Sequence, residues 1–239
     1  MLRNTADVDI SELTRRILDR RPDPHTPLPL AQAGHPALRR RTLRAEGRLE
    51  APLLRELVEA MTLTMRDAPG VGLAAPQIGL PLRLVVIEDR VPPAQPEDED
   101  PLERTPVPLR VLLDPEVELL GDQVVYAWEG CLSVDGWQSV VPRSRRVRLR
   151  ALELGDDGTL RPVDGELVGW PARIAQHETD HLAGTLCHDL AVPRSFVEAG
   201  YTSLYADMPE ATRRLGLVGE ITRLGPGEVL VEHSQAGTR

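Results

Sequence analysis

The sequence contains no lysine, so arginine supplies all 28 of its fixed positive side-chain charges. Aspartate and glutamate together number 37, which leaves a net charge of −9. A domain that binds nucleic acid over a broad surface usually has a basic patch and a high isoelectric point. The charge balance therefore argues against DNA as a partner.

Long hydrophobic runs are also missing, since no apolar stretch approaches the ~20 residues of a membrane-spanning helix. The first residues contain no apolar segment of the kind that a secretory signal requires, and Asp7, Asp9 and Glu12 are atypical of a transit peptide. We therefore expect a cytoplasmic protein with no membrane contact.

Cysteine is scarce, and two residues cannot form the disulfide framework of a small secreted protein. In a reducing compartment, a sparse cysteine serves as a core residue, a metal ligand or a nucleophile. Cys131 and Cys187 therefore have to be considered one at a time.

The N-terminal half alternates between helical and extended patterns. Ser11 is a plausible N-cap for a short amphipathic helix through Leu18, and a proline-rich linker follows it. Between residues 52 and 66 apolar side chains recur every three or four positions, which predicts a second helix. Residues 82–88 are typical of a buried strand.

Residues 91–108 are rich in proline and acidic side chains, which predicts a solvated surface insertion. Short strands are expected at 110–114, 117–120 and 124–130. Residues 145–154 alternate arginines with apolar side chains, which is typical of a half-exposed strand, and residues 155–158 resemble a hairpin turn. These arginines could contact RNA, but a half-exposed strand explains their pattern without a partner.

A third helix is predicted to run from Pro171 through His181 and to end at Gly184. Residues 193–239 have weak periodicity. The pattern as a whole predicts one α+β domain with long ends.

This third helix contains the motif H-E-x-x-H at His177, Glu178 and His181. One helical turn separates the two imidazoles, so both can reach the same metal ion. Glu178 projects beside them, where it can reach a water without binding the metal. Asp180 is interpreted either as a hydrogen-bond acceptor that supports the site or as an exposed acid on the helix surface.

The third metal ligand is ambiguous from spacing. Cys187, His188 and Glu198 lie downstream in registers that only approximate those of known zinc proteases, and Met208 is the one candidate for the Met-turn that some of them need, without a clean match. Cys131 lies upstream in a glycine-flanked turn. It would complete a Cys-His-His site with an open fourth position, although spacing alone favours an ordinary buried cysteine.

Three segments in the order "GVGLAAPQ" (70–77), "EGCLS" (129–133) and "QHETDHL" (176–182) match the signature motifs of peptide deformylases. The segments "VPR" (141–143) and "GWPARI" (169–174) are also similar to that family. The resemblance covers roughly residues 34–196. It implies a deformylase-like α+β fold, with small antiparallel or mixed sheets packed around a central H-E-x-x-H helix.

On this basis residues 31–196, with the insertion at 91–108, are expected to form the catalytic domain. Residues 1–30 and 197–239 are expected to be extensions.

The resemblance also implies roles for individual residues. Cys131, His177 and His181 would hold the metal, and Glu178 would act as general base and then acid. A water activated by the metal would attack the formyl carbon of an N-formylmethionyl peptide and release formate.

The remaining roles concern the oxyanion and the substrate. The Gln77 amide and the Leu132 backbone N–H would stabilise the tetrahedral oxyanion. Contacts with the substrate are expected from Val71, Gly72, Leu73 and Ile174. A buried ion pair between Glu129 and Arg143 is expected to support the metal loop.

Relatives usually carry an aromatic residue where this chain has Cys187, so we expect Cys187 to be a core residue without a chemical role. A thiolate and two imidazoles suit iron(II), zinc, nickel or cobalt. The resemblance implies iron(II) in the cell and nascent formylmethionyl peptides as partners.

Some bacterial deformylases dock on the ribosome through a basic C-terminal helix. The tail from Phe196 has six acidic and four basic residues, so its charge does not favour such docking.

Two other hypotheses remain. A zinc protease would use Cys187, His188 or Glu198 as its third ligand. A non-catalytic relative would bind peptide N-termini or ribosomes, although such a protein has no need of both Gln77 and Glu178.

Overall fold

The computed structural model describes residues 9–90 and 102–217, together with the backbone of 228–230. Its helices are α1 (Ile10–Leu18), α2 (Ala51–Asp67), α3 (Trp170–Ala183) and α4 (Met208–Arg214), with short 3-10 helices η2 (Pro36–Arg39), η3 (Ala75–Ile78), η4 (Cys187–Asp189) and η5 (Ala199–Tyr205). The strands are β1 (Gly72–Ala74), β2 (Leu84–Asp89), β3 (Val107–Gly130), β4 (Trp137–Leu154), β5 (Leu160–Val168), β6 (Val197–Glu198) and β7 (Glu228–Leu230).

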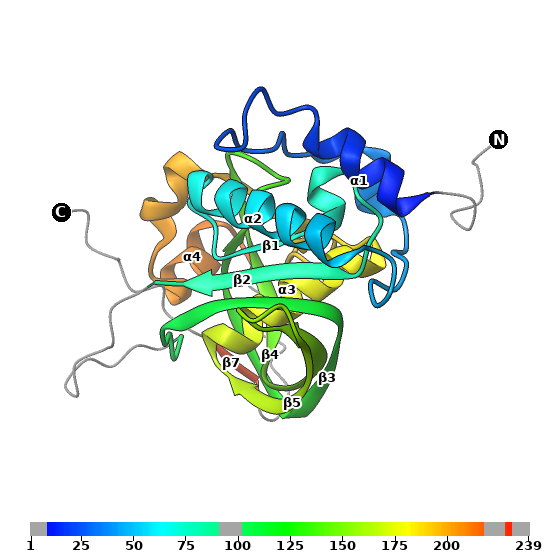
Figure 1. The fold of residues 1–239 in the computed structure, drawn as a ribbon. Helices are drawn as coiled ribbons and strands as arrows, with labels where there is room; N and C mark the ends of the chain where they lie inside the picture. Colours follow the sequence, from blue (N-terminus) through cyan, green and yellow to red (C-terminus); the bar gives the residue numbers. More distant parts are fainter. Residues whose placement is uncertain (1–8, 91–101, 218–227, 231–239) are drawn as a thin grey trace.

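The strands form one hydrogen-bonded sheet, in which β1 to β5 are antiparallel neighbours in chain order. Strand β6 adds to β4, and β7 runs parallel to β3. In Figure 1, α1 and α2 lie together on one side of β2, whereas β3 and β5 lie on the other. The predicted α+β class is confirmed.

Three short strands were predicted where the structure has the continuous strand β3. The pairing of β3 with β4 shifts register between Leu113 and Glu116 and again between Leu120 and Val124. Asp114 and Gly121 have positive φ values at these two places. The turn residues that suggested strand ends therefore mark bulges, which bend a strand without ending it.

Helix α3 packs against the sheet through its apolar side. Ile174 and Leu182 are buried in a cluster that includes Val85 and Leu149 of the sheet. The predicted alternation in β4 is confirmed, since Val147 and Leu149 are buried. The arginines between them are exposed and pair with acids on neighbouring strands, as Arg148 does with Asp164.

Two local predictions at the edges of elements are wrong. Asp9, and not Ser11, caps α1, because its side chain accepts a hydrogen bond from the Glu12 N–H. The end of the predicted solvated insertion is also ordered: Leu102 is buried, Arg104 pairs with Asp89, and β3 begins before residue 108. Residues 91–101 of the insertion lie outside the described residues.

The segments at both ends of the described chain pack against the rest of the domain. Ile17 of α1 and Leu28 are buried in one core cluster with Leu57 and Met61 of α2. Met208 of α4 packs beside Trp128 of the sheet. Within the described ranges, no helix has the length and apolar character needed to cross a membrane.

Candidate metal centre and active site

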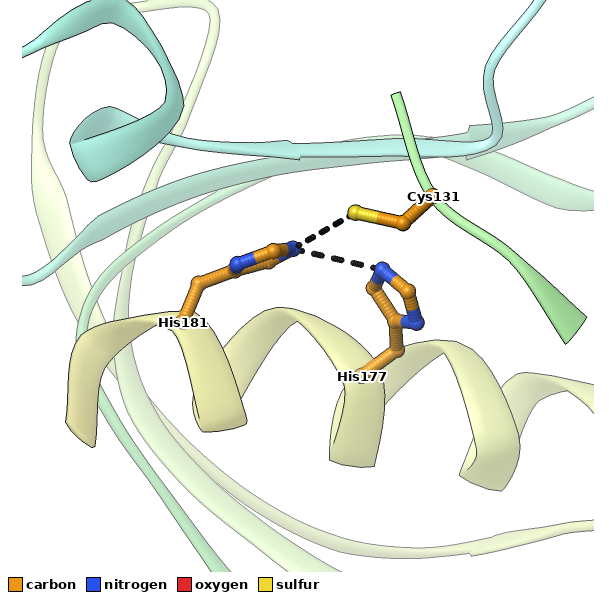
Figure 2. Close-up of side chains that lie close together, drawn as sticks. All are labelled: Cys131, His177 and His181. Carbon is orange, nitrogen blue, oxygen red and sulfur yellow. Dashed lines mark hydrogen bonds between the residues drawn. The ribbon is translucent and has the colours of Figure 1, made fainter. Parts of the chain in front are cut away.

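Three potential ligand atoms from two distant segments converge at one point. The Nε2 atoms of His177 and His181 on α3 are 3.2 Å apart, and the Cys131 Sγ lies 3.4 Å from the His181 Nε2. Figure 2 shows Cys131 reaching toward the two imidazoles from the segment that follows β3. The sequence motif could place only the two histidines together, and the fold adds the thiol.

The spacing of these atoms fits a tetrahedral metal ion. Nitrogen and sulfur ligands at the usual bond lengths of about 2.1 and 2.3 Å lie about 3.3 to 3.6 Å from one another around a tetrahedral ion. The two distances at His181 are close to this spacing, and all three ligand atoms of Cys131, His177 and His181 lie within 4.8 Å of one another. Two imidazoles and a thiol are a suitable donor set for iron(II), zinc, nickel or cobalt.

A second group, Glu129 with His177 and Cys187, has ligand atoms equally close together. Its carboxylate is not free for a metal, because both Glu129 oxygens already accept hydrogen bonds from arginine and histidine side chains. Cys131, His177 and His181 are therefore the set that fits an ion.

Helix α3 is held in place at both ends. Pro171 occupies the first turn, where its missing N–H costs nothing, and Gly184 ends the helix with a φ of 81°. A Cβ at position 184 would stand 2.8 Å from the backbone carbon of Arg39. The predicted ends of the helix are confirmed. They fix the position of α3 and therefore the position of the turn that carries the two histidines.

Glu129 organises the charged network behind the candidate metal centre. Its carboxylate accepts a 2.7 Å hydrogen bond from Nδ1 of His177 and forms buried ion pairs with Arg143 and Arg173. Arg143 also pairs with Asp180, so Asp180 contacts this arginine and not a ligand imidazole. The expected pair of Glu129 and Arg143 is present, and it holds the His177 ring with Nε2 facing Cys131 and His181.

The network controls the proton on each imidazole when no ion is bound. Burial disfavours the charged His177 ring, but the hydrogen bond to Glu129 and the nearby negative charges, that of Glu129 first, together outweigh burial and raise the pKa of His177 to about 9. Burial, together with the neighbouring His177, lowers the pKa of His181. The two Nε2 atoms face each other at 3.2 Å, in the place where an ion would bind both nitrogens.

Glu178 is a buried carboxyl group with a free oxygen. Its Oε2 has no hydrogen-bond partner among the described residues, and burial raises the pKa of Glu178 to about 7. Gly72 of β1 lies against this carboxyl group, because a Cβ there would stand 2.6 Å from the Glu178 Cδ. A carboxyl group with a pKa near neutrality is suited to accept and return a proton.

Gln77 and Leu132 flank the Cys131 thiol. The Gln77 Oε1 accepts a hydrogen bond from the Ala74 N–H, which turns its Nε2 toward Ser133 Oγ at 3.3 Å and Cys131 Sγ at 3.8 Å. Gln77 thus caps a backbone group and also presents a donor to the centre. In the described part of the chain, the Leu132 N–H has no acceptor.

Of the downstream candidates for a third ligand, one lies at the site and the others do not. Cys187 is buried and its thiol lies near that of Cys131, so it lies at the site without belonging to the set that fits an ion. This contact and burial raise the pKa of the Cys131 thiol. Among the described residues, His188 and Glu198 belong to no group that could hold a metal, and Met208 packs in a separate core cluster.

A cavity of about 690 Å³ opens onto the candidate centre. Val71, Gly72 and Ile174 line it, as do Gln77, Leu132 and Glu178. Leu73 does not, because neighbouring residues of a strand face opposite sides and its side chain is buried in the core with α2. The Leu73 side chain therefore does not line the cavity, and a contact between Leu73 and the substrate stays a prediction.

Sequence reasoning missed several residues of the site. Arg173 is buried and donates to Glu129 and to the Val125 and Val141 carbonyls. An arginine between Ala172 and Ile174, four positions before His177, was the available signal for a buried charge partner. Trp170, which lines the cavity beside Ile174, had no distinguishing signal.

An H-E-x-x-H helix, a cysteine from a separate loop and a buried carboxyl group at the base of a cavity define a metal-dependent hydrolase. The sequence model of the polypeptide deformylase family matches residues 27–196. The chain belongs to this family of metal-dependent enzymes, and its activity is the removal of the N-formyl group from N-formylmethionyl peptides.

Individual relatives agree. Peptide deformylase 3 of Streptomyces avermitilis is 48% identical over 194 residues, which cover 81% of this chain and 84% of the relative. Peptide deformylase 1 of Streptomyces coelicolor is 47% identical over 195 residues, with coverage of 81% and 86%.

Solved structures share the fold. A peptide deformylase from Acinetobacter baumannii, described as Met-Ala-Ser bound, matches with a TM-score of 0.61 and 30% identity, covering 70% of this chain and 99% of that one. A peptide deformylase from Synechococcus elongatus in complex with actinonin has a TM-score of 0.58 and 30% identity, with coverage of 82% and 88%.

Proposed function

We propose that Cys131, His177 and His181 hold one divalent metal ion per chain and that Glu178 moves the proton during deformylation. The convergence of three ligand atoms beside a buried carboxyl group carries this proposal. When bound, the ion would act as a Lewis acid and would activate water near neutral pH. Iron(II) is our proposal for the cell because the resemblance to deformylases implies it, and the thiolate-containing donor set is compatible with zinc, nickel and cobalt as well.

Glu178 is the proposed general base and general acid. Its free Oε2 would accept a proton from the attacking water, and the protonated carboxyl group would then donate it to the departing amine. The pKa of about 7 makes both steps feasible at the same pH. Gly72 supports this role, since only a residue without a side chain leaves space beside the carboxyl group.

Gln77 and Leu132 are the proposed donors to the oxyanion that forms on the formyl group. The Gln77 amide is buried and its orientation is fixed by the hydrogen bond from Ala74, so its Nε2 needs little rearrangement before the reaction. The Leu132 backbone N–H would donate from the opposite segment. Two fixed donors of this kind stabilise charge that develops only in the transition state.

We assign the methionine side chain to the apolar part of the cavity. Ile174 and Val71 line it, and Trp170, which we add to the set, extends the apolar wall. Gly72 would contact the backbone of the peptide. The relative from Acinetobacter baumannii that is described as Met-Ala-Ser bound supports a peptide of this type as the occupant.

Glu129, Arg143 and Asp180 are proposed to position the metal centre. Glu129 holds His177 through the Nδ1 hydrogen bond, and the arginine links that carboxylate to Asp180 on α3. Such partners fix the orientation of a ligand ring and increase its basicity.

The proposed catalytic unit is residues 31–196, with 1–30 and 197–239 as extensions, and the family match to 27–196 supports it. Nascent formylmethionyl chains would be the partners, and the cytoplasm, where such chains are made, the proposed location. Ribosome docking through a basic C-terminal helix is not part of the proposal. In α4, Arg213 and Arg214 are both ion-paired with Glu210, which leaves this helix without a free basic surface.

Anaerobic release of formate from formyl-Met-Ala-Ser by the iron-loaded protein tests the mechanism. We expect activity with wild type, and a loss of about 10²- to 10⁴-fold with Glu178→Ala at equal metal content. Equal activity of the two proteins with a fully occupied metal site would remove Glu178 from the mechanism.

A further inference from the structure

One short segment, residues 30–33, is hydrogen-bonded to both loops that carry the proposed oxyanion donors. The Ala31 N–H donates a 2.7 Å hydrogen bond to the Gln77 carbonyl. Two residues later, the Ala33 N–H donates a hydrogen bond of 2.7 Å to the Ser133 carbonyl, in the loop between β3 and β4. None of the three sequence motifs includes this segment. It nonetheless connects the loop of the first motif to the loop of the second.

Gln32 lies between these two backbone contacts, and its side chain holds the second loop as well. Its Nε2 donates a 3.0 Å hydrogen bond to the Leu132 carbonyl, and its Oε1 accepts one of 3.2 Å from the Asp135 N–H. The amide therefore uses its donor and its acceptor at once, which fixes the direction in which it faces. Among the described residues, no other group forms a hydrogen bond with the Leu132 backbone.

Leu132 depends on such support, because it lies between β3 and β4, where no strand ladder holds its backbone. The Leu132 N–H shares its peptide unit with the Cys131 carbonyl, which accepts a 2.9 Å hydrogen bond from the Val134 N–H. The next peptide unit contains the Leu132 carbonyl, to which Gln32 donates. Two successive peptide planes are therefore fixed, and with them the direction of the Leu132 N–H.

The segment around Gln32 is itself fixed to the core. Leu28 is buried, and its N–H donates a 2.8 Å hydrogen bond to the Thr64 Oγ1 of α2. Leu30 packs against the same core cluster, and beyond the segment Leu38 of η2 is fully buried. A segment that is held on both sides can impose its position on an otherwise unsupported loop, although the Gln32 side chain is exposed.

We propose that Gln32 is a positioning residue for deformylation, which orients the Leu132 N–H toward the oxyanion. This inference rests on the proposed function, because it takes Leu132 and Gln77 as the two oxyanion donors. A donor that is fixed in advance needs no reorganisation when the charge develops, so its alignment stabilises the transition state. Loss of that alignment should lower kcat and kcat/KM equally and leave KM unchanged.

Three substitutions separate the two hydrogen bonds of the Gln32 side chain. Gln32→Met keeps the length of the side chain and removes both bonds. Gln32→Glu keeps an acceptor for the Asp135 N–H but presents no donor to the Leu132 carbonyl. Gln32→Lys keeps a donor for that carbonyl and has no acceptor. Because residue 32 is exposed, all three proteins should fold, and thermal melting checks this.

Formate release from formyl-Met-Ala-Ser by the iron-loaded proteins gives kcat and KM. We expect kcat to fall about 10-fold in Gln32→Met and Gln32→Glu, with KM and metal content near those of wild type. This loss is part of the roughly 10²- to 10³-fold that removal of an oxyanion donor costs. Gln32→Lys should retain about half of the wild-type kcat, because it keeps the bond to Leu132.

Gln138→Met is the matched control. It makes the same change at another glutamine that lines the cavity, and within the described structure the Gln138 side chain forms no hydrogen bond to Leu132. Its kcat should equal that of wild type. A second readout follows the donor directly: in zinc-loaded protein that is isotope-labelled at leucine, the Leu132 amide resonance should shift and broaden in Gln32→Met but not in Gln138→Met.

An unchanged kcat in Gln32→Met, or an equal loss in Gln32→Met and Gln32→Lys, would overturn the inference. A raised KM with unchanged kcat would also contradict it, since Gln32 would then contact the peptide and not act through Leu132. Loss of metal in proportion to the loss of kcat would be equally fatal, because Gln32 would then serve to retain the ion. Failure of the wild-type protein to deformylate the peptide would instead overturn the proposed function.

Discussion

Gly72 and Glu178 are in direct contact across the cavity, although more than a hundred positions separate them in the chain. A Cβ at position 72 would stand 2.6 Å from the Glu178 Cδ and 2.8 Å from its Cγ. Non-bonded carbon atoms do not approach each other this closely in proteins, so the carboxyl group or strand β1 would have to move. The glycine of the first motif and the glutamate of the third therefore form one structural unit.

Gly72→Ala should reduce kcat at least about 10²-fold while metal content stays near that of wild type, because it displaces Glu178 and leaves the three proposed ligands in place. Formate release and elemental analysis of the metal provide the measurements. Gly165→Ala is the matched control, since a Cβ at that glycine meets nothing within 4 Å. Full activity of Gly72→Ala would show that the Glu178 position is not critical.

The two cysteines should differ in their effect on metal binding. Cys131→Ala removes a proposed ligand, so we expect the metal content of the purified protein to fall well below one ion per chain. Cys187→Ala removes a buried thiol beside the site, and we expect about one ion per chain with a loss of stability of about 1 kcal/mol from the cavity it leaves. Equal loss of metal in both variants would make Cys187 a ligand and contradict our assignment.

Glu178→Gln should stabilise the metal-free protein increasingly as pH rises. Burial raises the pKa of Glu178 to about 7, so the folded state favours the protonated form. The penalty for ionisation is absent below the unfolded pKa of about 4.5, grows as pH rises to about 7 and is constant above it.

The free energy of unfolding of Glu178→Gln should therefore exceed that of wild type by an amount on the order of 2 to 3 kcal/mol at pH 8, but not at pH 4. Urea unfolding at a series of pH values in the presence of a chelator measures this difference. A difference that does not change with pH would mean that Glu178 is not perturbed by its burial.

Arg173→Met should be much more harmful than the same change at an exposed arginine. Removal of Arg173 leaves the Glu129 carboxylate with one guanidinium instead of two, and it removes one donor from each of two backbone carbonyls. We expect a loss of about 3 kcal/mol of stability and a 10- to 100-fold loss of metal affinity.

Arg148→Met provides the comparison, because that arginine pairs with Asp164 at the surface and should cost less than about 1 kcal/mol. Chemical denaturation and competitive metal titration measure the two effects. If metal affinity is equal in the two variants, Arg173 does not support His177 through Glu129.

Much of the local structure could be predicted because it follows from short-range periodicity. The helix at α2, the alternation in β4, the turn at 155–158 and the ends of α3 were all predicted. Errors fell where tertiary contacts decide the outcome. A strand that continues through bulges resembles three strands in sequence, and Leu102, at the end of a polar insertion, is buried only because the sheet offers it a partner.

The sequence by itself determined the two histidines and the glutamate of the site, because the helical period alone puts residues 177 and 181 on one face. It also determined the family, through three motifs in a fixed order. Tertiary structure decided that the Cys131 thiol lies beside the two imidazoles, that Leu73 faces the core, and that Arg173 shares Glu129 with Arg143. It alone revealed the hydrogen bonds that join Gln32 to the loop between β3 and β4. Such relationships depend on how separate strands and helices pack, and local periodicity carries no information about contacts between residues far apart in the chain.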